Sequence, residues 1–263
     1  MIPQNPLDFS RWLLAILGTE VAIHHPTRLP QTPHVLVVSN HRSILDAPLL
    51  MMATQRSIRF ACHHYMSQVP GLRELVTSLG CIPIDGMQQR EKTFFPRAIQ
   101  LLQDKEMVGL FPEGARPMIE VPQMGQFNRF HRGFAHLALR APVQELAVLP
   151  VAIAPLAETQ TPVAPLQLFQ WFDPSEPLFQ GDGWHPVVVY QRVAVKFGQP
   201  IWITAEHRQH YQGKQAGLLT KALTQACTQE IANLLPNANG SAPPKTEPPP
   251  DADSNPFHGL FSP

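Results

Sequence analysis

The sequence predicts an α/β fold with a mainly parallel sheet flanked by helices, followed by a disordered C-terminal tail. Short apolar runs rich in β-branched residues alternate along the chain with segments whose apolar residues recur at helical spacing. A run such as residues 34–38 is typical of a strand buried on both faces of a parallel sheet. This alternation favours strands that are connected by helical crossovers.

Local signals mark the limits of several elements. Ser43 and Asp46 form a start signal for helix 43–54, and Gly80 ends helix 72–79. Pro83 cannot donate a backbone hydrogen bond, which places strand 81–84 near an edge. The predicted strands are residues 34–38, 58–62, 81–84, 107–111, 148–153, 187–190 and 193–197. The predicted helices are residues 43–54, 72–79, 93–103, 134–140 and 204–235, the last with a weaker patch at 211–213.

The two ends of the chain differ from the region between them. Residues 1–20 are predicted to form an apolar helix that anchors the protein at a membrane interface, with Trp12 at the level of the lipid headgroups. The alternative is a helix that packs on the protein's own core. Residues 21–235 are expected to form the main domain, and the Pro-rich residues 236–263 a disordered tail. No apolar run reaches about 18 residues, so no helix is expected to span a bilayer.

Composition excludes several functional classes. Lysine plus arginine equals aspartate plus glutamate, 20 against 20, which gives no reason to expect nucleic acid as a partner. The three cysteines, Cys62, Cys81 and Cys227, form no CxxC pair, so a disulfide framework or a structural zinc site is not expected. The adjacent histidine pairs at 24–25 and 63–64 are expected to point to opposite sides of their elements, and we predict no metal site.

His41 and Asp46 are the candidate catalytic residues. Strand 34–38 ends just before His41, at the edge where open α/β sheets place their ligand sites. The Asp46 carboxylate, in the first turn of the next helix, can reach back to the imidazole. A carboxylate bound to one imidazole nitrogen fixes the tautomer and leaves the other nitrogen free to take a proton. The alternative is that Asp46 only caps the helix with Ser43 and that His41 is an ordinary loop residue.

A second candidate site follows strand 107–111, again at the carboxyl end of a buried strand. Gly114 permits an unusual backbone turn in this loop, and Arg116 offers a rigid guanidinium fork suited to a phosphate. The alternative is an ion pair between Glu113 and Arg116 on a surface loop.

Four sequence motifs, and a further segment at the end of a strand, resemble those of a family of glycerolipid acyltransferases and occur in the same order. The family includes lysophosphatidate acyltransferase, that is, the PlsC-like 1-acylglycerol-3-phosphate O-acyltransferases. The resemblance covers roughly residues 34 to 203. The motifs are Asn40-His41-Arg42-Ser43-x-x-Asp46, Gly80-Cys81-Ile82-Pro83-Ile84-Asp85, Phe111-Pro112-Glu113-Gly114-x-Arg116, Val148-Leu149-Pro150-Val151-Ala152-Ile153 and Phe197-Gly198-Gln199-Pro200-Ile201.

The resemblance implies an acyltransferase of phospholipid biosynthesis on the cytoplasmic face of a membrane, as a peripheral or monotopic protein. A fatty acyl group would pass from acyl-CoA or acyl carrier protein to the hydroxyl of a lysophospholipid, most specifically 1-acylglycerol-3-phosphate, without a cofactor. His41 would act as the base and Asp46 would orient it, while residues 148–153 would help shape the acyl groove. The substrate-binding residues would be Asn40, Ser43, Glu113, Gly114 and Arg116, with Arg116 on the acceptor phosphate.

The chain also departs from the family pattern. Family members usually carry Thr or Ser where Ala115 stands, often Ser at the position of Pro117, and often Arg at the position of Gly86. Arg90 or Lys92 would have to replace that last anion contact. Two alternatives therefore stay open, an acyltransferase for a non-phosphate acceptor and a catalytically silent relative that binds lipid or a partner. A hydrolase in which His41 activates water is a third, although the chain has no G-x-S-x-G motif.

Overall fold

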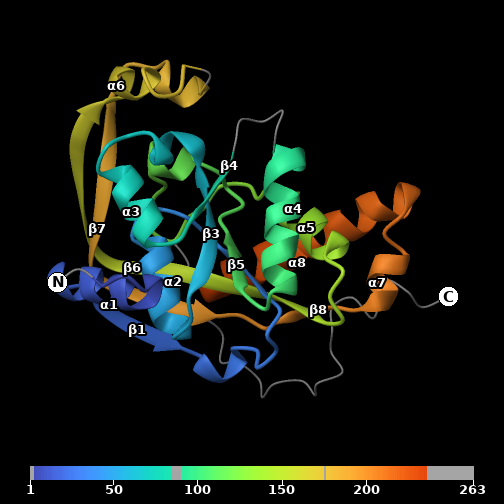
Figure 1. Cartoon of the computed structure of the whole chain (residues 1–263). Coiled ribbons are helices and arrows are strands. Elements are labelled where there is room, and N and C mark those ends of the chain that lie inside the picture. The colour runs from blue at the N-terminus through green and yellow to red at the C-terminus, as the bar shows by residue number, and fades with distance from the viewer. Residues whose placement is uncertain (1–2, 85–89, 175, 236–263) are drawn as a thin grey trace.

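The computed structural model describes residues 3–84, 90–174 and 176–235, with the backbone alone for residues 90–92 (Figure 1). The predicted tail therefore lies outside the described residues. In chain order the elements are α1 (Pro6–Ile16), β1 (Glu20–His24), η1 (Pro26–Arg28), β2 (Val35–Ser39), α2 (Asp46–Thr54), β3 (Ile58–His63), η2 (His64–Ser67), α3 (Leu72–Ser78), β4 (Ile82–Ile84), α4 (Arg90–Gln103), β5 (Met107–Leu110), η3 (Arg116–Met118), α5 (Gly133–Arg140), β6 (Leu146–Pro165), α6 (Leu166–Gln170), η4 (Pro177–Phe179), β7 (Trp184–Phe197), β8 (Ile201–Ile203), α7 (Ala205–Gln209) and α8 (Gly213–Leu234).

One mixed sheet runs through the molecule in the order β1-β7-β6-β2-β5-β3-β4, and β8 pairs with β6 beside this path. The pairs β1–β7, β6–β2, β2–β5, β5–β3 and β3–β4 are parallel, whereas β6–β7 and β6–β8 are antiparallel. The predicted α/β fold with a mainly parallel sheet is therefore confirmed. Every residue of β2 and β5 is buried, as expected for central strands covered on both faces.

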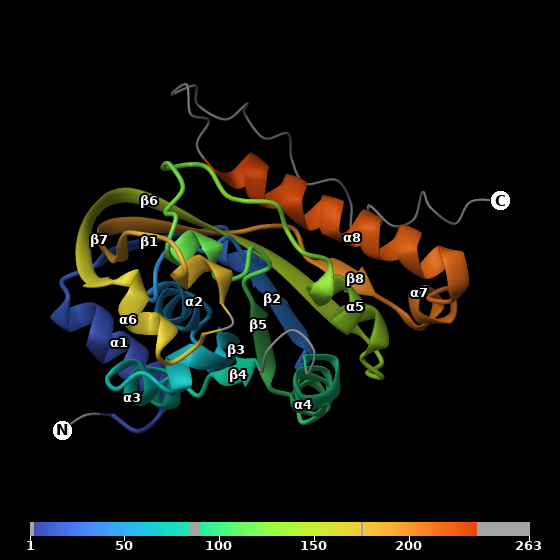
Figure 2. The same ribbon diagram turned by 90° about the horizontal axis from the view of Figure 1, so that it is seen from above.

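Helices cover both faces of the sheet (Figure 2). On one face, α4, α5 and α8 pack against side chains of β2, β5 and β6, such as Leu36, Val108 and Val148. On the other face, α1 and α2 pack against the alternate residues of the same strands, such as Val37 and Leu149. The hydrophobic core therefore forms two layers separated by the sheet.

Helix α1 packs on the protein's own core, which was the alternative interpretation of the N-terminal helix. Phe9 and Leu14 are buried against α2 and the sheet, and Trp12 packs at the margin of the same cluster. Ile16 and Leu17, at the end of the helix, stay exposed. Across the described part of the chain, no helix combines the length and the apolarity needed to cross a bilayer.

The segment 155–186, which carries no strand signal, forms a long hairpin together with the strands on either side of it. Strand β6 continues from the predicted 148–153 to Pro165, and the two strands predicted at 187–190 and 193–197 are one strand, β7. The register shifts near Pro155 and Pro162, because proline donates no ladder hydrogen bond and is tolerated at such irregularities. The prolines and exposed residues of this segment explain why hydrophobic alternation does not predict its strands.

The order of the strands gathers the candidate site residues at one edge of the sheet, where the parallel strands have their carboxyl ends. The parallel strands β2, β3, β4 and β5 all end there, and the loops that follow β2 and β5 carry His41 and Glu113. Strand β6 runs in the same direction but extends past this edge before β7 returns (Figure 1). The overhanging hairpin therefore brings residues from the second half of the chain to the same edge.

Candidate active site

His41 and Asp46 meet in the loop between β2 and α2. The His41 Nδ1 atom lies 2.8 Å from Asp46 Oδ2, and only 14% of the His41 side chain is exposed. Asp46 is the first residue of α2, so the alternation from strand to helix folds its carboxylate back over the preceding loop. With the Nδ1–H donated to Asp46, the tautomer leaves a lone pair on His41 Nε2.

The Asp46 carboxylate is fully buried and accepts four hydrogen bonds. Besides His41, Oδ2 accepts the backbone N–H groups of Arg42 at 2.6 Å and Ser43 at 2.9 Å. Oδ1 accepts the Tyr190 hydroxyl from β7 at 2.7 Å. Burial and the neighbouring Asp46 carboxylate raise the pKa of Tyr190 well above its ordinary value, which keeps the hydroxyl protonated as a donor. Asp46 therefore does more than begin helix α2, because these hydrogen bonds hold its carboxylate in place as the acceptor for His41.

Aromatic stacking holds the His41 ring from the other side. The ring lies parallel to Phe111, with centroids 4.1 Å apart, and Phe111 stacks in turn on Phe60 at 5.0 Å. Gly109 makes room for this column, because a Cβ at that position would lie 2.2 Å from the Phe60 ring. The imidazole is thus held between a carboxylate at its edge and an apolar face.

Glu113 supports the His41 loop through the backbone. Its carboxylate accepts the His41 N–H at 2.8 Å and also the N–H of Asn128. Burial raises the pKa of Glu113 to about 7, against the opposing effect of these two N–H groups. Both oxygens thus have partners within the protein, and the predicted contact between Glu113 and an acceptor stays a prediction.

Asn40 and Ser43 also bond to the protein itself. The Asn40 side chain exchanges two hydrogen bonds with the backbone of Ile153 on β6, at 2.8 and 2.9 Å. Ser43 Oγ donates to Val188 O at 2.6 Å and accepts the N–H of Leu45. These contacts join the His41 loop to the β6–β7 hairpin, and a direct contact with substrate stays a prediction for both residues.

A buried ion pair that the sequence does not indicate anchors the same loop. Arg42 binds Glu158 of β6 through two hydrogen bonds, of 2.6 and 2.7 Å, and a third guanidinium nitrogen donates to the carbonyl of Pro122. Burial raises the pKa of Glu158, but the hydrogen bonds and charge of Arg42 outweigh it, so the net shift is downward. Arg42 therefore holds the His41 loop to β6, and its guanidinium is not available to bind an anion.

The loop after β5 presents Gly114 and Arg116 differently. Gly114 adopts a positive φ of 76°, as its predicted role in an unusual turn requires, and it lines the cavity beside His41. The Arg116 Nε atom lies 3.4 Å from Glu120 Oε2, so Arg116 pairs with Glu120 and not with Glu113. The side chains of Arg116 and Glu120 are both about 60% exposed. Arg116 is thus available to an anionic ligand at little cost. Gly86 and the side chains of Arg90 and Lys92 lie outside the described residues.

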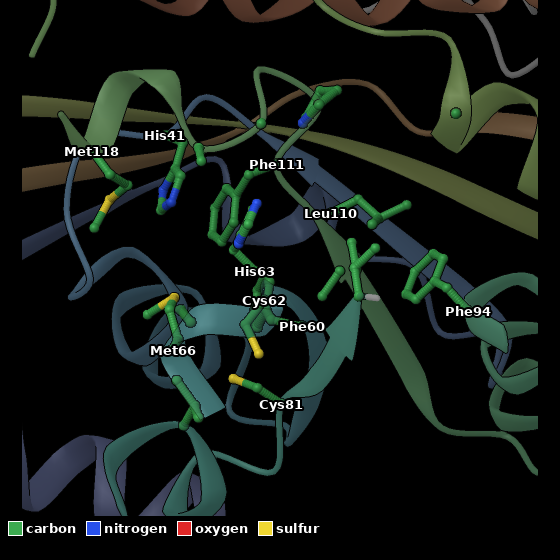
Figure 3. A pocket seen from close by; sticks show the side chains of 18 of the residues that line it. His41, Phe60, Cys62, His63, Met66, Cys81, Phe94, Leu110, Phe111 and Met118 are labelled. Carbon is green, nitrogen blue, oxygen red and sulfur yellow. The ribbon is translucent and has the colours of Figure 1, made fainter. Parts of the chain in front are cut away.

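An apolar cavity of about 210 Å³ opens beside His41 (Figure 3). His41 and Phe94 stand on opposite sides of it, and Phe111 and Leu110 lie between them (Figure 3). Most of its wall consists of carbon and sulfur, contributed by β3, α3, β4, α4 and β5; the described wall includes Phe60, Cys62, Leu79, Cys81, Ile84 and Phe94. Residues 148–153 do not line this cavity, because this central segment of β6 is buried in the core, and the expectation that they shape an acyl groove stays a prediction.

Comparisons with known proteins agree with this geometry. A protein family described as Acyltransferase matches residues 20–156. Among solved structures, the crystal structure of the 1-acyl-sn-glycerophosphate (LPA) acyltransferase, PlsC, from Thermotoga maritima has a TM-score of 0.51 over 85% of this chain and 77% of that chain, with 16% sequence identity. At that identity the similarity concerns the fold. No curated protein matches the sequence significantly.

Proposed function

The chain belongs to the acyltransferase family, and we propose that it transfers a fatty acyl group from a thioester donor to the hydroxyl of a lysophospholipid. The observation that carries the proposal is the contact between His41 and the buried Asp46, at the wall of an apolar cavity. A carboxylate-oriented imidazole supplies a base, and the cavity supplies an apolar environment for an acyl chain.

The reaction proceeds by direct transfer in this proposal. His41 Nε2 removes the proton from the acceptor hydroxyl, and the hydroxyl oxygen attacks the thioester carbonyl. The tetrahedral intermediate then collapses with cleavage of the carbon–sulfur bond, and the imidazolium returns its proton to the departing thiolate. Asp46 stabilises the imidazolium between the two transfers. General base catalysis of this kind contributes about 100- to 10,000-fold.

A covalent acyl-enzyme is disfavoured by the side chains around His41. Ser43 donates its hydroxyl proton to the Val188 carbonyl and is buried, so it is not placed as a nucleophile. Cys62 and Cys81 line the cavity, but a hydrogen bond with Cys62 and burial raise the pKa of the Cys81 thiol far above its ordinary value. Because the thiolate is the nucleophile, this thiol is poorly suited to attack a thioester.

The acceptor we propose is 1-acylglycerol-3-phosphate, held through its phosphate by Arg116. The exposed pair with Glu120 is weak, so a dianionic phosphate is expected to replace it. A second acceptor class, without phosphate, is favoured by Ala115 in the cavity wall and by Pro117 two residues later, neither of which offers a hydroxyl. Acyl-CoA and acyl carrier protein are both retained as donors, and no cofactor is proposed.

An acylation assay with purified protein separates these possibilities. Both donors are offered with lysophosphatidate, other lysophospholipids and a lyso-acceptor without phosphate. Wild type is expected to acylate lysophosphatidate, His41→Ala to lose at least 100-fold, and His24→Ala, an exposed histidine of β1, to retain full activity. Inactivity on every acceptor combined with lipid binding would establish the silent relative instead.

Arg116 has its own control in the same assay. Arg116→Ala should raise the KM for lysophosphatidate and leave the KM of a non-phosphate acceptor unchanged. Arg73 makes a comparable exposed pair with Glu74, so Arg73→Ala should change neither value. Equal effects of Arg116→Ala on both acceptors would exclude a phosphate contact.

We also propose that the protein works on the cytoplasmic face of a membrane, since its acceptor is a lipid. Large apolar side chains are exposed near the end of the β6–β7 hairpin, where Trp171 is 81% and Trp184 57% exposed. Exposed tryptophans are typical of membrane-interface contacts. The second exposed group is Ile16 and Leu17 at the end of α1.

Liposome flotation distinguishes the two surfaces. Trp171→Ser/Trp184→Ser and Ile16→Ser/Leu17→Ser are compared with Leu218→Ser, which removes an exposed leucine from α8. Release by either double variant alone identifies the membrane contact. Deletion of residues 1–18 would not be a clean test of the first surface, because it also removes Phe9 and Leu14 from the core. Flotation that none of the variants weakens would contradict both surfaces.

A further inference from the structure

Two adjacent histidines and two acidic residues meet at the carboxyl end of β3, apart from the His41–Asp46 pair. His64 Nδ1 lies 3.4 Å and His63 Nδ1 3.8 Å from the Asp173 carboxylate, which is 97% buried. One ligand atom from each of these three residues lies within 4.8 Å of the others. Asp173 comes from the segment between α6 and η4, at the end of the β6–β7 hairpin.

The two histidines face the same group because the backbone changes conformation between them. His63 is the last residue of β3, with φ −67° and ψ 142°, and His64 begins η2. The ring centroids are 5.4 Å apart and the planes differ by 34°. Alternation along a strand, the reason for predicting no metal site here, therefore does not apply to this pair.

The nitrogen atoms that face Asp173 have no hydrogen-bond partner among the described residues. This holds for Nδ1 of both His63 and His64, and both atoms are buried. On the other side of the His63 ring, Nε2 lies 2.9 Å from Glu176 Oε2, so this nitrogen carries the proton and Nδ1 carries a lone pair. Separations of 3.4 and 3.8 Å from Asp173 are too long for hydrogen bonds with good geometry. The buried Nδ1 atoms of both histidines thus face a buried carboxylate without a hydrogen bond to it, an arrangement that suits a cation bound between them.

The spacing suits a tetrahedral metal ion. Metal–ligand distances of about 2.0–2.1 Å in a tetrahedron place neighbouring ligand atoms about 3.3–3.4 Å apart. Two imidazoles and one carboxylate are a donor set that zinc accepts, whereas magnesium and calcium prefer oxygen. A ligand histidine commonly donates its second N–H to a carboxylate, which is the position that Glu176 occupies on His63.

We propose that His63 Nδ1, His64 Nδ1 and the Asp173 carboxylate bind one zinc-class divalent ion, with Glu176 orienting His63. The ion joins the end of β3 to the hairpin segment between α6 and η4, beside the cluster in which Tyr65 packs against Leu166 and Phe169 of α6 and Phe179 of η4. His63 also lines the active-site cavity (Figure 3), so an ion bound there would stand at the cavity wall. The proposal concerns binding and stability and does not rest on acyl transfer.

Calorimetric titration of the metal-stripped full chain with zinc chloride tests the site. We expect one equivalent bound, a rise in Tm on binding, and no comparable heat with magnesium chloride. His64→Ala and Asp173→Asn should abolish the high-affinity phase. Glu176→Gln, which keeps the three ligands, should weaken binding by about 10- to 100-fold.

The exposed pair His24–His25 provides the matched control. His24→Ala/His25→Ala should bind zinc as wild type does. Absence of stoichiometric zinc binding by wild type would overturn the proposal, as would loss of binding in this control with retention in His64→Ala. If His64→Ala or Asp173→Asn fails to fold, unchanged zinc affinity in the folded Glu176→Gln variant would also overturn it.

Discussion

The exchange Asp46→Asn separates the charge of this residue from its geometry. Oδ2 accepts three hydrogen bonds, two of them from backbone N–H groups of Arg42 and Ser43, whereas Oδ1 faces only the Tyr190 hydroxyl. The asparagine oxygen is therefore expected to take the place of Oδ2, and its NH₂ group to donate to Tyr190, whose hydroxyl can turn to accept. His41 would keep its Nδ1–H tautomer and lose only the negative charge beside it.

The expected magnitude follows from that lost charge. The His41 and Asp46 atoms in contact are 2.8 Å apart. The centres of the two charges are farther apart, at about 4 Å, where an effective dielectric of about 20 gives an attraction of about 4 kcal/mol. Because about 1.4 kcal/mol corresponds to a factor of ten, kcat should fall about a thousandfold. The KM values for both substrates should change little, since the imidazolium forms only during the reaction.

Two measurements check this reasoning. Acylation kinetics give kcat, and nitrogen NMR of His41 in the Asp46→Asn variant reports which ring nitrogen bears the proton. Thermal unfolding confirms that the variant is folded. A folded variant with less than a tenfold loss would refute the assignment of imidazolium stabilisation to Asp46. A proton on Nε2 with a loss of about 10,000-fold would instead show that the amide has turned and that the backbone N–H groups do not lock it.

Three further outcomes are expected. Tyr190→Phe removes a hydrogen bond to the buried Asp46 carboxylate and should lower the urea unfolding free energy by about 2 kcal/mol and also lower kcat; unchanged values of both would contradict the contact. The pKa of Glu113 rises from 4.5 to about 7 on folding, so its protonated form stabilises the fold below pH 4.5, and up to about 3 kcal/mol is lost between pH 4.5 and pH 7. Glu113→Gln should flatten the decline in unfolding free energy over this window, and an identical decline would exclude Glu113 as its source. Gly109→Ala should cost about 1–3 kcal/mol by pushing Phe60 from its place in the aromatic column, whereas Gly217→Ala, where a Cβ meets nothing within 4 Å, should cost nothing; equal stabilities would contradict the packing.

The sequence by itself determined the features that depend on neighbouring residues. Apolar runs at 34–38 and 107–111 predict buried strands, and a buried strand followed by a helix brings His41 and Asp46 together over five residues. The positive φ of Gly114 was likewise implied by the local turn. Such contacts are encoded locally, because the side-chain period and the change from strand to helix already place the groups near each other.

Only the tertiary structure decided the contacts that complete the site. Glu113 is 72 residues from His41, and Tyr190 is 144 residues from Asp46. The parallel order of β2 and β5 brings the first pair together, and the overhang of the β6–β7 hairpin brings the second. That overhang also carries Asp173 to His63 and His64. The strands of the hairpin contain prolines and exposed residues, so hydrophobic periodicity does not predict their full length. In addition, no local sequence pattern predicts which side chain of one strand will contact the loop that follows another strand.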